Sequence, residues 1–336
     1  MNKIALNFED GVTRFIDVRP DELVADAAYR LGLNIPMDCR DGACGTCKCH
    51  CESGDYSLGD YIEDAMTEEE AAQGYVLTCQ MKAKSDCIIK IPASSAVCKT
   101  KPSTLSASLL EVRALSASTI GLSVRLEPGQ TLGYLPGQYV NISVPGTAQT
   151  RSYSFSSLIK DDVAEFLVRN IPGGLMSTYL SAQAKSGDAL TLTGPIGSFY
   201  LRSVTRPLLF LAGGTGLAPF LAMLDRLQDT PSSHPIHMIY GVTNDADLVE
   251  VDKLSAYAQS IPSFTFTTVV ADTASTHERK GYVTHHLPES ALFGGDVDVY
   301  LCGPPPMVDA VRAHFAEMKL EPVNFYFEKF NPSESK

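Results

Sequence analysis

Three cysteines stand close together near the start of the sequence, and a fourth lies farther along. The run from Cys39 through Cys44 to Cys47 has the spacing Cys-x4-Cys-x2-Cys, and Cys79 follows 32 residues after the last of them. This spacing is typical of the thiolate ligands of a plant-type [2Fe–2S] cluster. Small residues fill the positions between the three cysteines, so the backbone can approach the cluster and direct N–H groups at its sulfides. The pattern therefore predicts a site for one-electron transfer.

Two other interpretations of these cysteines compete with the cluster. One is a buried thiol pair, and the other is a structural zinc site. Such a zinc site usually takes two Cys-x2-Cys pairs, but Cys87 lies eight residues beyond Cys79. Cys49 and Cys51 continue an alternating pattern that suits a strand leaving the loop, so we interpret them as packed thiols. The other cysteines outside the ligand pattern are Cys98 and Cys302.

The side-chain pattern predicts an N-terminal domain over residues 1–97. A hairpin is expected from strands at residues 4–8 and 13–18, followed by a short helix at residues 21–31. Residues 94–103 contain small residues, lysines and Pro102, and this composition predicts a linker.

Two further domains are expected after the linker. Residues 104–204 contain short alternating stretches separated by Gly and Pro, which is the pattern of a small antiparallel β-barrel. From residue 205 to residue 336 the pattern changes to continuous apolar strands, such as residues 208–212, separated by helical stretches. That alternation is typical of a parallel α/β sheet. We therefore expect a multidomain protein with a barrel domain and an α/β domain.

The chain is acidic, and its composition excludes some classes of partner. Its 336 residues have a net charge of −12, which makes nucleic acid an unsuitable partner. Many of the acidic side chains of the first domain gather in one stretch: Asp60, Glu63, Asp64, Glu68, Glu69 and Glu70. This stretch is either a solvated helix face or a docking surface for a basic patch on a redox partner.

The hydrophobic pattern and the cysteine count predict a cytoplasmic protein. No run of about 18 apolar residues is present, so we expect no membrane span. The N-terminal residues lack the long apolar core of a signal peptide. Nine cysteines, with four assigned to metal, leave an odd number, which argues against a disulfide framework.

Two segments of the barrel region have the chemistry to bind a flavin nucleotide. Arg151 can form charge-assisted hydrogen bonds to a pyrophosphate, Tyr153 can stack on a planar ring, and Ser154 can donate to a ring nitrogen. About twenty residues later, residues 173–180 form an expected Gly-rich turn that opens a helix at Ser177 or its neighbour, where free N–H groups suit a pyrophosphate. Taken singly, such a turn is more often a helix cap, and such a tyrosine is more often a core residue.

Two motifs in the α/β region indicate a nicotinamide site. The run Gly213-Gly214-Thr215-Gly216 follows an apolar strand, so its glycines can admit a pyrophosphate at a helix N-terminus. The run Cys302-Gly303-Pro304 follows another strand, at the edge of the sheet where ligands bind. A buried strand cysteine followed by a turn is the alternative interpretation. After the strand ending at residue 241, Asp245 stands where a 2′-phosphate would be repelled, which favours NADH.

The Arg-x-Tyr-Ser and Gly-Gly-Thr-Gly-x-x-Pro motifs, together with Cys-Gly-Pro, resemble those of the ferredoxin–NADP reductase superfamily. The resemblance implies a set of FAD-binding residues: Arg151, Ser152, Tyr153, Ser154, Val168, Arg169, Gly174, Met176, Ser177 and Phe330, the last as an aromatic cover on the flavin. It implies a set of NADH-binding residues: Gly213, Gly214, Thr215, Gly216, Asp245, Cys302, Gly303 and Pro304. It also places Ser154 near the hydride-accepting nitrogen and Cys302 near the nicotinamide, as the catalytic residues. Six residues follow Phe330, a departure from the family pattern.

The whole chain, in the order ferredoxin, FAD barrel and NAD domain, resembles the reductase components of two-component aromatic-ring dioxygenases of the benzoate, toluate and anthranilate type. The resemblance implies a β-grasp fold for the ferredoxin domain. It implies hydride transfer from NADH to FAD, then single electrons to the [2Fe–2S] cluster and on to the Rieske centre of a terminal oxygenase. Two alternatives stay open: the reductase of a soluble di-iron monooxygenase, and a non-enzymatic redox sensor.

Overall fold

The computed structural model describes residues 1–330, which form two compact units. One comprises Met1–Ser103 with Pro195–Ser198, and the other comprises Thr104–Gly194 with the chain from Phe199 onward. Each unit has its own hydrophobic core.

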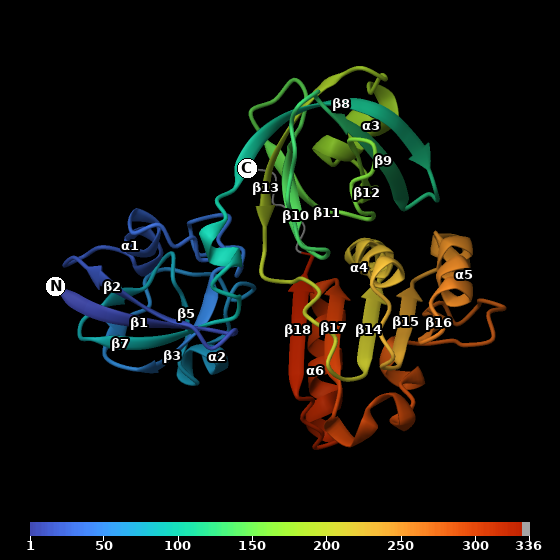
Figure 1. The fold of residues 1–336 in the computed structure, drawn as a ribbon. Coiled ribbons are helices and arrows are strands. Elements are labelled where there is room, and N and C mark those ends of the chain that lie inside the picture. Colours follow the sequence, from blue (N-terminus) through green and yellow to red (C-terminus); the bar gives the residue numbers. More distant parts are fainter. Residues whose placement is uncertain (331–336) are drawn as a thin grey trace. The chain divides into compact units, whose positions relative to one another are not determined.

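The first unit contains a five-stranded sheet with the order β2-β1-β7-β3-β5 (Figure 1). Its strands and helices have the following bounds: β1 Asn2–Phe8, β2 Thr13–Val18, α1 Val24–Arg30, β3 Lys48–Ser53, β4 Tyr56–Ser57, α2 Glu68–Ala72, β5 Tyr75–Leu77, β6 Lys82–Ala83 and β7 Cys87–Ile91. The first two strands form the predicted hairpin, and β1 also pairs with β7 in parallel. This mixed sheet with a helix against it confirms the ferredoxin-like fold. The helix is shorter than expected, because Asp21 has a positive φ of 63° and the helical conformation begins only at Val24.

The predicted linker is wrong over its first half. Residues 97–99 form a 3-10 turn whose Cys98 is fully buried in the core of the first unit. The amide of Asn34 donates to the Cys98 carbonyl at 2.6 Å, and Ser95 donates from its amide and its hydroxyl to Asp10. The composition of this stretch resembles a linker, but the contacts that fix it come from residues more than 60 positions away.

The barrel region forms a six-stranded sheet with the order β11-β10-β13-β8-β9-β12. Its elements are β8 Ser103–Ala114, β9 Thr119–Leu126, β10 Tyr139–Ser143, β11 Thr150–Ser154, β12 Val163–Arg169, α3 Leu175–Ala182 and β13 Ala189–Ile196. An antiparallel bridge between Phe155 and Phe166 joins the two edges of the sheet, so the barrel is nearly closed. Inward-facing aliphatic residues of five of its strands fill the interior, together with Tyr153 of β11 and with Met176 and Leu180 of α3.

The α/β region contains the predicted parallel sheet, with the order β16-β15-β14-β17-β18 and all arrows pointing the same way (Figure 1). Its elements are β14 Leu208–Gly213, α4 Ala218–Asp229, β15 Ile236–Val242, α5 Val251–Ser260, β16 Phe264–Val270, β17 Asp298–Gly303, α6 Pro305–Glu317 and β18 Asn324–Lys329. All six residues of β14 are buried, as expected for a central strand covered on both faces.

Two hydrophobic clusters cover the two faces of this sheet. Phe210 and Leu224 belong to the cluster that contains α4 and α5, whereas Leu211 and Val311 belong to the cluster that contains α6. The first cluster also includes Phe199, which follows the last barrel strand. The cores of the barrel and of the α/β sheet are separate, but Phe199 and Leu167 of the barrel region pack into the α/β cluster and Ala222 of α4 packs into the barrel cluster. None of the helices within residues 1–330 has the length and apolar character needed to cross a bilayer.

Candidate functional site

The loop that carries three of the four predicted cluster ligands has an unusual backbone. Arg40, Gly42 and Gly45 all have positive φ angles, of 65°, 81° and 73°. A Cβ atom on Gly42 would lie 2.3 Å from the carbonyl oxygen of Asp60, and one on Gly45 would lie 3.0 Å from that of Ala65. Segment 60–65 therefore packs directly on the loop, and the loop sequence must have glycine at these positions.

The structure brings the four predicted ligand cysteines together as two thiol pairs. Cys39 hydrogen-bonds Cys44, whose amide also donates to the Cys39 sulfur at 3.3 Å, and Cys47 hydrogen-bonds Cys79. Within each pair the bond from its partner stabilises one thiolate, lowering the pKa of Cys44 to about 6 and that of Cys79 to about 7. The same bonds raise the pKa of Cys39 and Cys47. Each pair therefore contains one sulfur with thiolate character at neutral pH.

Pairs of sulfurs are the arrangement that a two-iron cluster needs. Each iron of a [2Fe–2S] cluster takes two protein thiolates, whereas a structural zinc ion takes four ligands around one centre. Within residues 1–330, no group of three or more Cys, His, Asp or Glu side chains is arranged around a single ion position. Two pairs of thiols are a donor set that fits a two-iron cluster. Cys49 and Cys51 lie on β3 and are buried in the core, as predicted for packed thiols.

A pair of glycine substitutions distinguishes a steric clash in the cluster loop from the conformational cost of a positive φ angle alone. We expect Gly42→Ala to lower the cluster content, because the new methyl group collides with the Asp60 carbonyl that holds the loop. Gly11 has a similar φ of 77° but no atom within 4 Å of its Cβ position, so Gly11→Ala carries only the conformational cost of about 1–2 kcal/mol. Visible absorbance of the cluster per bound flavin checks the difference. Equal cluster content in the two variants would contradict this account of the loop.

The acidic stretch beside the loop is only partly a surface. Glu70 is buried and forms an ion pair with Lys48 at 2.6 Å, and it also completes a capping box with Thr67 at the start of α2. Its neighbours Glu68 and Glu69 are exposed. Glu70 therefore belongs to the structural support of β3, the strand that leaves the cluster loop, and not to the acidic surface.

In the barrel, β11 directs its predicted flavin residues to two different faces. Tyr153 packs against the barrel core, and Arg151 is half-buried on the same face. Ser152 is exposed on the opposite face, where its hydroxyl donates to the Asn141 side chain at 2.7 Å. The side chain of Ser152 is therefore directed away from the face that carries Arg151 and Tyr153.

The predicted pyrophosphate turn and helix are present, but the helix begins earlier than expected. It starts at Leu175 with Gly174 as its N-cap, so Ser177 lies inside the first turn. The Ser177 hydroxyl accepts from the Ile171 amide at 2.9 Å and donates to the Arg169 carbonyl at 3.2 Å. The side chain of Ser177 therefore holds the turn in place. Gly174 supplies no capping side chain, so the first N–H groups of the helix are available to an anion.

The side chains of the other predicted FAD residues differ in accessibility. Val168 and Met176 are buried in the barrel core, so only their backbone atoms can contact a cofactor. Arg169 has an exposed side chain.

The two nicotinamide motifs lie side by side at one edge of the parallel sheet. A Cβ on Gly216 would lie 2.3 Å from the Cys302 carbonyl oxygen, and one on Gly303 would lie 2.8 Å from the Met307 sulfur. The glycines therefore allow the loop after β14 to pack on the end of β17. Pro304 is the N-cap of α6, so a helix begins at each motif.

Asp245 lies in a short turn that follows β15, at the same sheet edge. Its carboxylate accepts from the Ser275 hydroxyl at 2.7 Å, so the segment after β16 folds back onto it. Asp247 accepts from the hydroxyl of Ser118, a residue of the barrel. Partial burial raises the pKa of Asp247, but the hydrogen bonds from Ser118 and Asn244 outweigh this effect and lower the pKa. The turn thus carries negative charge at neutral pH.

The barrel and the sheet meet at Ser154, the predicted hydride-side residue. Ser154 is buried, and its hydroxyl donates to Glu328 of β18 at 3.4 Å. Glu328 pairs in register with Cys302, whose thiol pKa is raised by burial and by the nearby Glu328 charge. The amide of Phe330 donates to the Gly303 carbonyl at 3.0 Å, so the predicted aromatic cover lies at this edge. Ser154, Cys302, Glu328 and Phe330 therefore converge.

Glu328 is the functional candidate that the sequence interpretation missed. The signal was a single charged residue in the aromatic strand of residues 325–327, next to the end of the sheet. Its significance depends on the register of β18 against β17, which no local pattern reveals.

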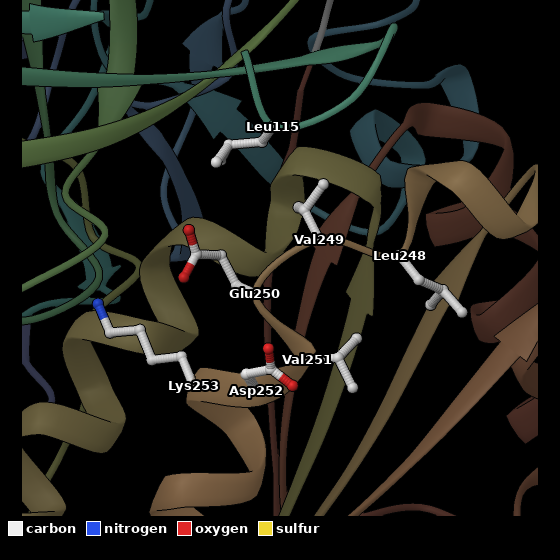
Figure 2. Close-up of a pocket in the computed structure, with 7 residues that line it drawn as sticks. All are labelled: Leu115, Leu248, Val249, Glu250, Val251, Asp252 and Lys253. Carbon is white, nitrogen blue, oxygen red and sulfur yellow. The ribbon is translucent and has the colours of Figure 1, made fainter. Parts of the chain in front are cut away.

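A pocket of about 410 Å³ lies between the barrel residue Leu115 and residues 248–253 (Figure 2). The acidic side chains of Glu250 and Asp252 line it, together with Lys253. None of the predicted site residues lines this pocket, and its two carboxylates do not suit a phosphate.

Three protein-family models match this chain, one over each of the three large sheets. The "2Fe-2S iron-sulfur cluster binding domain" matches residues 7–84, the "Oxidoreductase FAD-binding domain" matches residues 106–200, and the "Oxidoreductase NAD-binding domain" matches residues 210–313. These matches define the class of the protein: an iron–sulfur flavoprotein oxidoreductase that takes a [2Fe–2S] cluster, FAD and NAD.

Full-length relatives narrow the class to a family. The chain is 58% identical to the toluate 1,2-dioxygenase electron transfer component of Pseudomonas putida, with 99% of each chain covered. It is 49% identical to the 2-halobenzoate 1,2-dioxygenase electron transfer component of Burkholderia cepacia, again over 99% of each chain. A crystal structure of a cytochrome P450 reductase of Amycolatopsis matches with a TM-score of 0.73 at 31% identity, covering 98% of this chain and 100% of that one. The chain belongs to the family of benzoate-type 1,2-dioxygenase electron transfer components.

Proposed function

We propose that this protein takes hydride from NADH and delivers single electrons to the Rieske centre of a terminal dioxygenase. When bound, FAD accepts two electrons as hydride, and the [2Fe–2S] cluster carries one electron at a time. The observation that carries the proposal is the convergence of Ser154, Cys302 and Glu328 where the flavin strand meets the nicotinamide motifs. Neither the di-iron monooxygenase reductase nor the redox sensor is favoured by the family relationship.

The residues of the second unit have separate tasks in this proposal. Arg151 and the free amides at the start of α3 would hold the FAD pyrophosphate, and the loop from Gly213 to Gly216 would hold that of NADH. Ser154, held beside Glu328, would lie at the hydride-accepting end of the flavin, where its single proton would be donated in place of its bond to Glu328. Cys302 is an apolar neighbour of the nicotinamide, because its buried thiol stays protonated.

The cluster loop provides the exit for electrons. Cys39 and Cys44 are only partly buried, so this side of the ligand set is near solvent. The loop is flanked by the exposed acidic side chains of Asp60 and Glu63, and by Ile62, whose amide donates to the Gly42 carbonyl. We propose that this surface faces a basic patch on the oxygenase. Plant-type clusters at roughly −400 mV lie below Rieske centres at about −150 to +300 mV, so the last step is downhill.

The test compares two acceptors. With NADH, the purified holoprotein should reduce the Rieske component of a benzoate-type dioxygenase rapidly, and a di-iron hydroxylase slowly. The rate with the Rieske component should fall as ionic strength rises, because salt screens the acidic surface. Preference for the di-iron hydroxylase would overturn the proposal.

The coenzyme preference rests on Asp245. We expect Asp245→Arg to improve kcat/KM for NADPH relative to NADH, since it removes a carboxylate and adds a cation at the turn after β15. Asp252→Arg makes the same charge change at the start of α5 and is the matched control. An unchanged NADPH preference, or an equal change in the control, would remove Asp245 from the ribose site.

We also propose the compartment and the domain limits. None of the nine cysteines forms a disulfide, which supports a cytoplasmic location. We propose an iron–sulfur domain over residues 1–97, with the buried turn at Cys98 as an addition to its core, an FAD domain over residues 104–204 and an NAD domain over residues 205–336, supported by the separate sheets.

A further inference from the structure

A buried carboxylate joins the barrel to the helix that follows the nicotinamide loop. Asp225 lies on α4 and is only 7% exposed. One of its oxygens accepts from the Leu158 amide of the barrel at 2.9 Å, and the other accepts from the Tyr257 hydroxyl of α5 at 2.8 Å. Both donors are neutral.

The barrel partner of Asp225, Leu158, lies close in the chain to the flavin strand β11. Leu158 lies four residues after Ser154, in the loop between β11 and β12. The preceding carbonyl, of Ser157, accepts from the Tyr134 hydroxyl, and the Tyr134 ring stacks on Phe155 with the ring centroids 4.0 Å apart. The loop at the end of β11 is therefore fixed both by the barrel and by α4.

On the other side, α4 continues without a break from the nicotinamide loop. The loop of Gly214–Leu217 leads directly into α4 at Ala218, and Asp225 lies two turns farther along. A shift of α4 relative to the barrel would move this loop relative to β11. The carboxylate thus lies on a covalent and hydrogen-bonded path between the two nucleotide motifs, separate from the one through Ser154 and Glu328.

Burial of a carboxylate is a costly way to join two elements. A buried charge loses its hydration, and an apolar side chain of similar volume often stabilises a core equally well or better. What the hydrogen bonds add is direction, because each oxygen accepts only at a defined distance and angle. Hydride transfer depends on direction and distance, since misplacement of the reacting groups by about 1 Å can lower the rate about a hundredfold.

We propose that Asp225 is a positioning residue for hydride transfer, which holds the nicotinamide loop and the flavin strand in register through the Leu158 amide. The inference rests on the proposed function and assigns a role to a residue that contacts neither cofactor. Because Asp225 acts only on the geometry between the two halves, its loss should slow the hydride step and leave NADH binding nearly unchanged.

The test measures flavin reduction by NADH in a stopped-flow instrument, in the holoprotein. Asp225→Ala should lower the limiting rate constant at saturating NADH about tenfold or more. The NADH concentration at half-saturation should change less than twofold. Asp225→Asn should restore most of the rate, since its amide oxygen can accept from Leu158 and its NH₂ group can donate to the Tyr257 oxygen. Tyr257→Phe, which removes the other bond to Asp225 but leaves the contact with the barrel, is the matched control and should reduce flavin at nearly the wild-type rate.

Two results would overturn the proposal: a wild-type limiting rate in Asp225→Ala, or an equal fall in Tyr257→Phe at the same melting temperature. If Asp225→Ala fails to fold, hydrogen exchange of the FAD-free wild-type protein still decides. The Leu158 amide should be protected as strongly as the amides of α4, and rapid exchange at Leu158 would refute the contact. Absence of NADH-dependent flavin reduction in the wild-type protein would instead contradict the proposed function.

Discussion

Cys79→Ser should abolish reduction of one-electron acceptors such as cytochrome c while NADH still reduces the flavin. Cys79 is paired with Cys47 and supplies a sulfur with thiolate character, so its loss leaves one iron with a single cysteine ligand. We expect the visible absorbance of the cluster to disappear and the rate of cytochrome c reduction to fall more than about a hundredfold. Ferricyanide, which can take electrons from the flavin, should still be reduced by NADH.

The matched control for this variant is Cys49→Ser. Cys49 is equally buried and lies on β3, next to the loop, but it packs in the core and does not pair with another ligand cysteine. Its replacement should keep the cluster. Loss of ferricyanide reduction in Cys79→Ser would show that the flavin and nicotinamide sites depend on the cluster domain, against the separation of the two units.

Ser154→Ala should slow flavin reduction by NADH about tenfold to a hundredfold, since removal of a buried hydrogen-bonding group costs about 1–3 kcal/mol. The hydroxyl lies where the barrel meets Glu328 and the end of β17, so its loss acts on the hydride step. The measurement is the limiting rate constant of flavin reduction, with FAD content determined in parallel. The cluster absorbance should stay unchanged, because the cluster loop belongs to the other unit.

Ser152→Ala tests a second serine of the same strand, which lies two residues before Ser154 on the same face but is exposed. The Ser152 hydroxyl donates to Asn141, so its removal should leave both FAD content and flavin reduction close to wild type. The sequence motif alone assigns both serines to the flavin, whereas in the structure only Ser154 is buried and reaches Glu328. Equal losses in the two variants would restore the motif-based assignment and refute the structural one.

Local motifs carry the predictions for most of the candidate site. The spacing of Cys39, Cys44 and Cys47 identifies cluster ligands because all three belong to one short loop. The two Gly-rich turns are similarly recognisable, since each turn and the helix that follows it are continuous in the chain. Alternating and continuous apolar patterns likewise predicted a barrel followed by a parallel sheet, and the topology confirms both.

Predictions that depended on contacts between distant segments were less successful. Composition indicated a linker around Cys98, but that thiol is fully buried in the first unit by residues from other strands. The acidic stretch indicated one uniform face, but Glu70 turns inward because Lys48, 22 positions earlier, lies opposite to it. In both cases the local sequence gives no sign that the side chain is buried, because the residues that contact it are distant in the sequence and come close only in the folded protein.

The sequence by itself determined the chemistry of this protein: a [2Fe–2S] cluster, FAD and NAD, taken in that order along one chain. It did so because ligand spacing and glycine turns are properties of short continuous segments. Only the tertiary structure decided which thiols pair, which serine of β11 faces Glu328, and that Asp225 joins the two nucleotide motifs. These features depend on strand register and helix packing, which bring together atoms that are up to 174 positions apart in the sequence.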